Sequence, residues 1–327
     1  MLRQKSLLVS LVLLIDRVPG PSEPAKRSRG RPKTYSDRLI MKALVIMIVR
    51  RLYPAYALLA FLHQPDPWPR QLRALLGEPG RFPSRRTWER RLAALPPSLP
   101  GLVGYFGRHL VTLLQPWARH GRAVAVDSTA LETGGGVWHK RHREQGLIPH
   151  SSIDTEAGWS KSGWRGWWYG WKLHLAVTVG SVWIPLAAEL TVANYGDNEV
   201  APLLLTQLPG EVRYVLGDTH YNDPELRQQC HRHGRELIAT QRGPYPHRGA
   251  GVEVRKVFHK LRSQAIEPFN GLYKNVFEWR VKMPVKGLQR SQLLALGAVV
   301  VYQLVLSYQH EQNLPLGQGI KSFLRAA

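Results

Sequence analysis

The strongest constraint on the fold is a change of pattern near residue 121. Before this point apolar residues recur at helical spacing, and after it short apolar runs of strand type alternate with helical segments. The strand-type runs cover 123–131, 170–179, 183–192, 212–218 and 236–241, and helices are expected at 197–208, 223–234, 255–277 and 291–309. This order predicts an α/β fold, with a mixed sheet and helices on its faces.

Two of the strand-type runs end on a carboxylate. Asp127 follows the apolar residues 123–126 within the first run, and Asp218 ends the fourth run after Gly217, which we expect to let the backbone turn. If these two strands are neighbours, both side chains lie near one edge of the sheet, and a helix packed across that edge adds Glu267. Three carboxylates that converge without Lys or Arg between them repel one another and need cations, and oxygen-only ligation suits Mg²⁺. Two such ions about 4 Å apart catalyse in-line phosphoryl transfer.

Each carboxylate also has an ordinary structural interpretation. An Asp at the end of a strand commonly caps a loop or a helix, and a Glu on a helix is commonly a solvated surface charge. We assign Asn222 and Asp223 to a turn and a helix cap, outside the catalytic set. His220 is a candidate for positioning a phosphate or a water.

The charge balance indicates a polyanionic partner. The 327-residue chain has 45 Lys and Arg against 23 Asp and Glu, a formal net charge of +22. Nucleic acid is the most common partner for such a surface, and an anionic membrane or a ribosomal assembly is the alternative. The single cysteine, Cys230, excludes an intramolecular disulfide and a Cys-based zinc site, which fits a reducing cytoplasmic setting.

The chain divides into four predicted segments. Residues 1–34 combine an apolar run with a basic, proline-rich arm, 35–120 form a helical DNA-binding region, 121–310 form the catalytic domain and 311–327 form a tail. The apolar run at 7–15 resembles part of a signal peptide, but it lacks a cleavage site and is too short to span a bilayer, so we expect a docking helix. The apolar run at 293–306 contains Gln303 and reads as a buried helix, and no membrane partner is expected.

Several basic and aromatic segments are candidates for DNA contact. Arg29 and Arg31 form an Arg-Gly-Arg core that can lie in an A·T-rich minor groove. The alternative is that this segment is a basic flexible linker. Arg85, Arg86 and Arg90 lie on the helix expected after Ser84, which is either the reading helix of a helix-turn-helix or an amphipathic surface helix.

A tryptophan-rich stretch interleaved with basic residues lies at 159–172. Trp168 is a candidate for stacking on bases, whereas a core or interface role is the alternative for the whole cluster. Lys172 and His174 alternate onto one strand face, which we expect to lie near the active site, and both are candidates for DNA contact. His139, His142 and His150, or His231 with His233, lack a clean transition-metal motif.

Taken in order, these stretches resemble a known family. The segments "AVDSTAL", "GWKLHLAVTVGSVWIPLAAELTVANYGDNEVAPLLL", "VLGDTHYND" and "IEPFNGLYKN", spread over about 120–305, are similar to the acidic-triad (DDE) transposases of bacterial insertion sequences. The segment "YSDRLIMKALVIMIVRRLY" is similar to the helical region that precedes the catalytic domain in that family.

The resemblance implies a ribonuclease H-like mixed sheet flanked by helices and preceded by an all-α, helix-turn-helix-like region. It implies that Asp127, Asp218 and Glu267 bind Mg²⁺, for which Mn²⁺ substitutes, and that Lys274, seven residues after Glu267, contacts a DNA phosphate. Asn270 shares that helix face. The implied activity is DNA cleavage at transposon ends followed by transfer of the 3′-OH strand into target DNA, by a homodimer on double-stranded DNA in the bacterial cytoplasm at the nucleoid.

The sequence departs from the family at one point. The fuller family signature has a Tyr seven residues and an Arg four residues before the Glu, where this chain has Lys260 and Ser263, and Arg262 is displaced by one position. The chain therefore departs from the signature that defines this subgroup, while the triad is unaffected. The alternatives are a metal-dependent nuclease of the same fold without strand transfer, and a catalytically inactive DNA-binding relative.

Overall fold

The computed structural model describes residues 6–18, 34–77, 81–117, 122–163, 165–240 and 250–327, with side chains from 256 onward in the last range. Helices come first along the described chain: α1 (Leu7–Arg17), α2 (Asp37–Arg50), α3 (Ala55–Leu62), α4 (Pro67–Leu75), α5 (Arg85–Ala94), the short η1 (Pro96–Ser98) and α6 (Leu99–Leu114). The helix expected after Ser84 is present as α5, and the rest of the described part of 35–117 is also mainly helical, whereas α4 was not specifically predicted. The predicted DNA contacts Arg29 and Arg31 lie outside the described residues.

A mixed sheet follows the helices, as predicted. Its strands are β1 (Ala123–Glu132), β2 (Gly158–Ser162), β3 (Gly166–Thr178), β4 (Pro185–Val192), β5 (Tyr214–Gly217) and β6 (Glu236–Ala239). The order is β2-β3-β1-β5-β6, and β4 also pairs with β3. The long β3 is antiparallel to β1, β2 and β4, whereas β5 is parallel to both β1 and β6. β2 was not predicted, because its short polar sequence becomes a strand only by pairing with β3.

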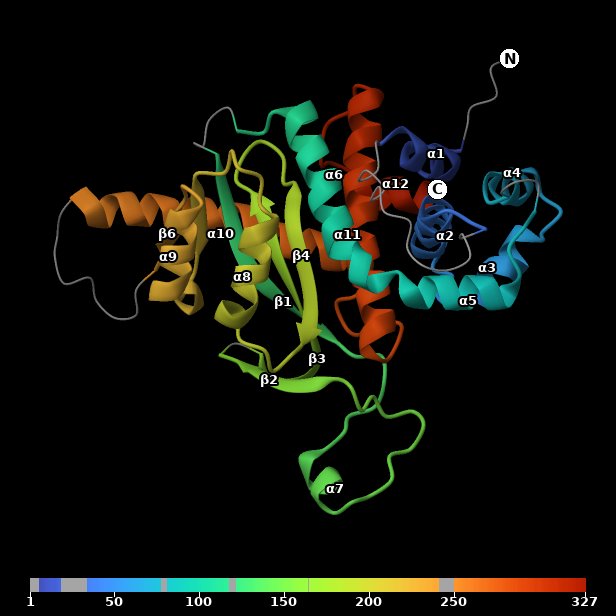
Figure 1. Ribbon diagram of the computed structural model, residues 1–327, viewed down its shortest axis with the longest axis horizontal. Helices are drawn as coiled ribbons and strands as arrows, with labels where there is room; N and C mark the ends of the chain where they lie inside the picture. Colours follow the sequence, from blue (N-terminus) through green and yellow to red (C-terminus); the bar gives the residue numbers. More distant parts are fainter. Residues whose placement is uncertain (1–5, 19–33, 78–80, 118–121, 164, 241–249) are drawn as a thin grey trace.

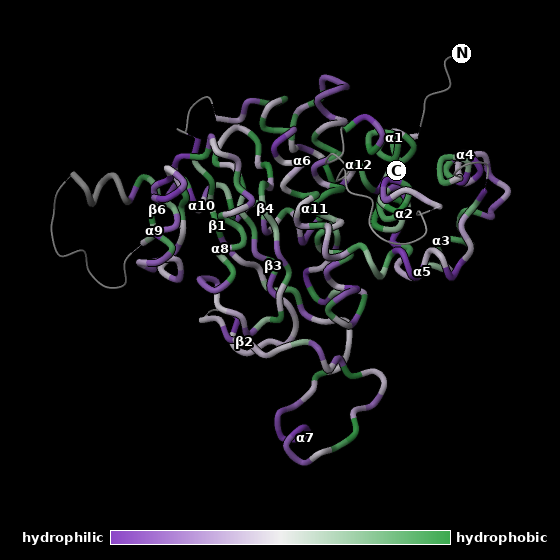
Figure 2. The backbone as a smooth tube through the Cα atoms, in the orientation of Figure 1, coloured by the Kyte–Doolittle hydropathy of each residue, from purple (hydrophilic) through white to green (hydrophobic). Residues whose placement is uncertain are grey.

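Helices cover the sheet on both faces (Figure 1). α8 (Asp197–Gln207) contacts β3 and β4, while α10 (Ala250–Val276) contacts β1, β3, β5 and β6. α9 (Pro224–Arg232) lies against β6, and η2 (Thr219–Tyr221) follows β5 directly. Figure 2 shows hydrophobic segments gathered in the strands and central helices. The predicted mixed α/β architecture is confirmed.

The central helix of the protein is α11 (Leu288–Glu311), which packs against α1, α2, α6 and β4. By length and composition α11 is long enough to cross a membrane, but 89% of its apolar window is buried inside the protein. The polar Gln303 is accommodated because its side-chain amide donates to the carbonyls of Val103 at 2.9 Å and Pro185 at 2.8 Å. α11 is therefore the buried core helix that the sequence predicted.

Both ends of the chain pack onto the same core. α1 begins at the cap Ser6 and buries its apolar face against α2 and α11, so the predicted docking helix is present. The predicted C-terminal tail contains a further helix, α12 (Ile320–Ala326), which contacts α10 and α1. One hydrophobic core extends from α1 to α12 across all of the predicted segment boundaries, which remain predictions.

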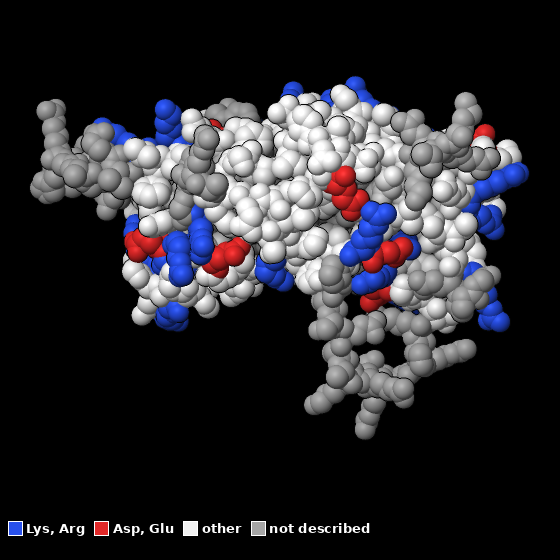
Figure 3. Space-filling model, turned by 90° about the horizontal axis from the view of Figure 1, so that it is seen from above, with Lys and Arg blue, Asp and Glu red and all other residues white. Residues whose placement is uncertain are grey.

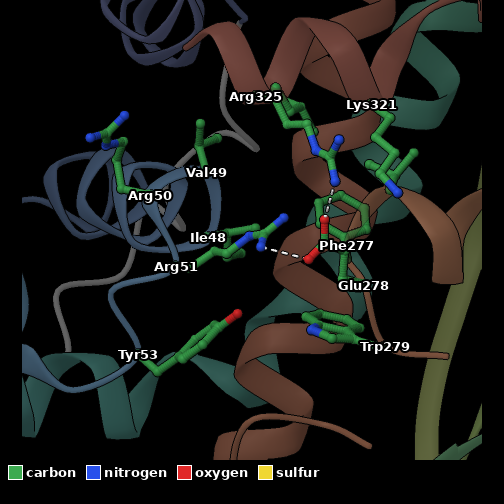
Figure 4. Close-up of a pocket in the computed structure, with 12 residues that line it drawn as sticks. Ile48, Val49, Arg50, Arg51, Tyr53, Phe277, Glu278, Trp279, Lys321 and Arg325 are labelled. Atoms are coloured by element: carbon green, nitrogen blue, oxygen red, sulfur yellow. Dashed lines mark hydrogen bonds and ion pairs between the residues drawn. The ribbon is translucent and has the colours of Figure 1, made fainter. Parts of the chain in front are cut away.

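Glu278 joins three distant segments of the chain. Directly after α10, it accepts hydrogen bonds from Arg51 at the end of α2, at 2.7 Å, and from Arg325 in α12, at 2.8 Å (Figure 4). These two bonds lower the pKa of the Glu278 carboxyl to about 2. The groove beside it, of about 320 Å³, is also lined by Tyr53 and Lys321. This contact ties the N-terminal helices to the helix that carries Glu267.

An arm formed by residues 133–157 leaves the sheet between β1 and β2 and carries the short α7 (Lys140–Glu144) (Figure 1). Its base is fixed by Asp154, which accepts hydrogen bonds from the Thr133 hydroxyl and, at 2.9 Å, from the backbone N–H of Gly287. The arm is therefore anchored at the start of α11 while its outer part projects from the fold.

Gly217 is required by close packing rather than by an unusual backbone conformation. The expectation that it lets the chain turn is wrong, because Gly217 is the last residue of β5 and is not among the glycines with positive φ. A Cβ atom on Gly217 would lie 2.5 Å from Cβ of Tyr221. The glycine allows the buried Tyr221 to fold back against the end of β5.

We expect Gly217→Ala to lower the free energy of unfolding by about 1–3 kcal/mol, because the new methyl group overlaps the Tyr221 side chain. Gly101→Ala is the control, since a Cβ there meets nothing within 4 Å and Ala is favoured in a helix. Urea unfolding followed by circular dichroism measures both. Equal stability of the Gly217→Ala variant and the wild type would contradict the packing explanation.

Candidate active site

The parallel pairing of β1 and β5 brings Asp127 and Asp218 together. The register joins Val124 to Val215 and Ala125 to Leu216. Two residues further along each strand, Asp127 and Asp218 stand at the same level of the sheet, and β5 ends just before Asp218. The first and fourth predicted strands are therefore neighbours, as the sequence hypothesis required.

A buried arginine lies where the three predicted carboxylates converge. One terminal nitrogen of Arg262, Nη2, is 3.4 Å from Oδ2 of Asp127 and 3.9 Å from Oδ2 of Asp218. The other, Nη1, is 3.6 Å from Oε1 of Glu267. The expectation that no Lys or Arg lies between these carboxylates is wrong, since Arg262 on α10, 5% exposed, contacts all three. One helix supplies both Glu267 and this counter-ion.

Burial raises the pKa of Asp127 far above its ordinary value. Desolvation raises the pKa of the Asp127 carboxyl to about 7, with the negative charge of Asp218 acting in the same direction. The positive charge of Arg262 and the hydrogen bond from the Ser128 backbone N–H, at 2.9 Å, oppose this shift. Arg262 thus favours the ionised form of Asp127, which is the form that binds a cation.

Asp218 has two roles in the structure. Its Oδ1 accepts the backbone N–H of His220 at 2.8 Å and caps η2, so the capping interpretation holds. Its Oδ2 lies 3.1 Å from Nδ1 of His220 and also faces Arg262. Asp223 caps α9 by accepting from the N–H groups of Glu225 and Leu226, as predicted. The cap fixes one oxygen of Asp218 and leaves the other for the site.

The donor set has the chemistry of a divalent-cation site. Three carboxylates from β1, the end of β5 and α10 converge, which suits a hard cation such as Mg²⁺. The Arg262 guanidinium lies between them, and among the described residues no group of three or more His, Cys, Asp and Glu side chains is arranged to hold a metal ion as it stands. The three carboxylates are therefore ligands of the kind that Mg²⁺ prefers, and the Arg262 guanidinium is the positive charge among them.

Lys274 lies on the site side of α10. Burial lowers the pKa of its ammonium group to about 8, the positive charge of Arg165 acts in the same direction, and the negative charge of Asp127 opposes it. Asn270 is partly buried, and its Oδ1 has no hydrogen-bond partner. Both residues remain candidates for DNA contact.

Lys172 and His174 share a strand face, as predicted, but this face is opposite to Asp127. Asp127 pairs across the sheet with Leu175, whereas the Lys172 ammonium and Nδ1 of His174 lie 3.4 Å and 3.6 Å from Oδ1 of Asp197 at the start of α8. His174 is fully buried and therefore offers no surface to DNA. The sequence analysis did not single out Asp197. Its position in the first turn of a helix that follows a strand is the feature that could have indicated it.

The remaining predicted DNA contacts differ in exposure. Trp168 is 5% exposed, so the core interpretation applies to it, and among the described tryptophans of the cluster the exposed one is Trp167, at 66%. Arg85, Arg86 and Arg90 are exposed on α5, where Arg85 also pairs with Glu89 at 2.8 Å. Their exposure keeps these three arginines as candidates.

We expect His174 to make the protein less stable as the pH falls from 6.5 to about 4. Burial lowers its pKa in the folded protein to about 4, so in this window the unfolded chain binds a proton that the folded chain does not. Asp127, whose pKa is raised to about 7 by burial, contributes a pH dependence of opposite sign in the same window, so the test is the difference between two proteins. In denaturant unfolding at several pH values, the free energy of unfolding should fall more steeply with decreasing pH in the wild type than in His174→Gln, by up to about one proton. A slope of the same steepness in this variant would contradict the assignment.

Comparisons with known proteins identify the family. The family model described as "Transposase DDE domain" matches residues 119–304, more than half of the chain and the whole of the sheet with α8–α10. No curated protein matches the chain in sequence. A solved structure, the cryo-electron microscopy structure of a piggyBac transposase synaptic complex with hairpin DNA, is similar with a TM-score of 0.39 and 8% identity, over 98% of this chain and 76% of that chain. This structural likeness is low, so the assignment rests on the family match: the chain belongs to the DDE-type transposases.

Proposed function

We propose that this protein is a DNA transposase that hydrolyses phosphodiester bonds at the ends of its element and joins the freed 3′-OH to target DNA. The observation that supports this most directly is the convergence of Asp127, Asp218 and Glu267 around one cation, inside the segment that the transposase family model matches. Residues far apart in the sequence meet there, and they share the oxygen chemistry of a magnesium site.

In this proposal the three carboxylates hold Mg²⁺, or Mn²⁺ in its place. When bound, the ions supply activation of the attacking oxygen and stabilisation of the leaving oxygen. Asp127 and Asp218 are held by backbone N–H groups, so their free oxygens are positioned before a ligand binds. Lys274 and Asn270 on the same side of α10 contact the DNA backbone close to the scissile bond.

We further propose a ribonuclease H-like catalytic domain, supported by the order of its strands and by the antiparallel β3–β4 pair beside the parallel β1, β5 and β6. The boundaries 35–120 and 121–310 divide the DNA-binding helices from this domain. The exposed arginines of α5 serve a helix-turn-helix-like role, and Arg29 and Arg31 reach a minor groove.

Double-stranded DNA is the proposed partner, as terminal repeats and as target. The support is the net charge of +22. On the face drawn in Figure 3 the Lys and Arg side chains form several separate groups with Asp and Glu beside some of them, so that face carries no single basic surface among the residues described there. Two element ends must be paired, which leads us to propose a homodimer acting on DNA at the bacterial nucleoid.

A second candidate has an observation in its favour. A guanidinium fills the point where metal ions would bind, as expected of a relative that binds DNA but has lost catalysis. A metal-dependent nuclease without strand transfer is the remaining alternative. Activity on DNA distinguishes these possibilities.

We expect Asp218→Asn to reduce Mg²⁺-dependent cleavage of DNA carrying the element's terminal repeats by at least about 100-fold, because one ligand charge is lost. The control is Asp223→Asn, an acidic residue five positions away that only caps α9. Gel analysis of end-labelled DNA measures cleavage, and a second unlabelled duplex detects joining.

Each result selects one function. Cleavage with joining in the wild type, lost in Asp218→Asn and retained in Asp223→Asn, supports the transposase. Cleavage without joining indicates a nuclease. Specific DNA binding by the wild type, without cleavage in Mg²⁺ or Mn²⁺, indicates an inactive relative.

A further inference from the structure

Among the described ion pairs, Arg262 is the one basic side chain that contacts all three carboxylates of the site. The separations of 3.4, 3.9 and 3.6 Å are longer than the roughly 2.8 Å of a charge-assisted hydrogen bond. The guanidinium therefore balances the negative charge without being tightly bound to any one carboxylate. When all three groups are ionised, two of the three negative charges remain uncompensated by Arg262.

The two aspartates are held independently of Arg262. Asp127 accepts a hydrogen bond from the Ser128 N–H at 2.9 Å, and Asp218 accepts one from the His220 N–H at 2.8 Å. Arg262 is held less firmly than the two aspartates, because its Nε is buried without a hydrogen-bond partner. If one group in this cluster moves, the contacts favour movement of the long arginine side chain and retention of both aspartates.

The path for such a movement is provided by Glu267. Its side chain is 60% exposed, whereas that of Arg262 is 6% exposed, and the two lie on the same helix, five residues apart. The guanidinium already contacts Glu267 through Nη1, so Glu267 offers it a charged partner nearer the surface.

We propose that Arg262 is a displaceable internal counter-ion: in the metal-free protein it keeps the three carboxylates together, and divalent cations bind by displacing its guanidinium. This rests on the proposed metal-binding function of the triad. The guanidinium and the metal compete because both are attracted to the meeting point of the same three carboxylates. The cost of displacing Arg262 lowers the apparent affinity for metal, and only ions with more than a single charge compete effectively.

The experiment measures metal binding to the full-length, DNA-free protein and does not depend on catalysis. Isothermal titration with MnCl₂ gives the affinity, and thermal unfolding with and without MnCl₂ gives the stabilisation. The variants are Arg262→Gln, Asp218→Asn and the control Arg235→Gln. Arg235 is also buried, but it donates to the carbonyls of Leu205 and Leu208 and contacts no carboxylate of the site.

We expect Arg262→Gln to bind Mn²⁺ about tenfold more tightly than the wild type, because a competing positive charge is removed. Without metal the same variant should unfold at least about 5 °C lower, since the carboxylates lose their counter-ion. MnCl₂ should recover most of this loss. Arg235→Gln should also lose stability, but its Mn²⁺ affinity should equal that of the wild type.

The alternative outcomes separate this proposal from the proposed function. Unchanged or weaker Mn²⁺ binding in Arg262→Gln, together with lost binding in Asp218→Asn, overturns the counter-ion role and leaves the metal site intact. Mn²⁺ binding that Asp218→Asn does not reduce overturns the metal site itself. If Arg262→Gln shows no cooperative unfolding without metal, MnCl₂ should restore it, and failure to do so while Arg235→Gln remains folded overturns the proposal.

Discussion

Mutual repulsion of three carboxylates is the constraint on which the rest of this structure depends. Asp127 and Asp218 are adjacent because β1 and β5 run parallel in register, and Glu267 reaches them from α10 across the sheet. Such a cluster inside a fold is unstable without positive charge. Arg262 supplies that charge from the same helix as Glu267. The position of α10 therefore decides both the convergence of the acids and their neutralisation.

The surrounding architecture holds α10 in this position. The helix packs against β1, β3, β5 and β6, and Glu278 directly after it binds Arg51 at the end of α2 and Arg325 in α12. α11 then connects the N-terminal helices to β4 through a buried interface. The site thus consists of short polar ends on strands and one helix, supported by a large apolar core.

Much of this arrangement was predictable from local patterns. The mixed sheet, the helix of Glu267, the burial of α11 and the docking of α1 follow from apolar periodicity, and the cap at Asp223 follows from turn chemistry. The errors arose where a residue depends on distant partners. Gly217 was expected to turn the chain, yet its role is set by Tyr221, and Trp168 and His174 were assigned to DNA although the fold buries both.

The sequence by itself determined the order of the main strands and helices, β2 and α4 excepted, because these follow from apolar periodicity. It also singled out Asp127 and Asp218 near the ends of apolar runs and Glu267 on a helix. Only the tertiary structure decided that Arg262 lies among the acids and that Asp197 gathers Lys172 and His174 on the opposite face. The reason is that the partners in each contact come from different elements. Which charges become neighbours depends on strand register and helix placement, and neither is encoded in the spacing along one segment.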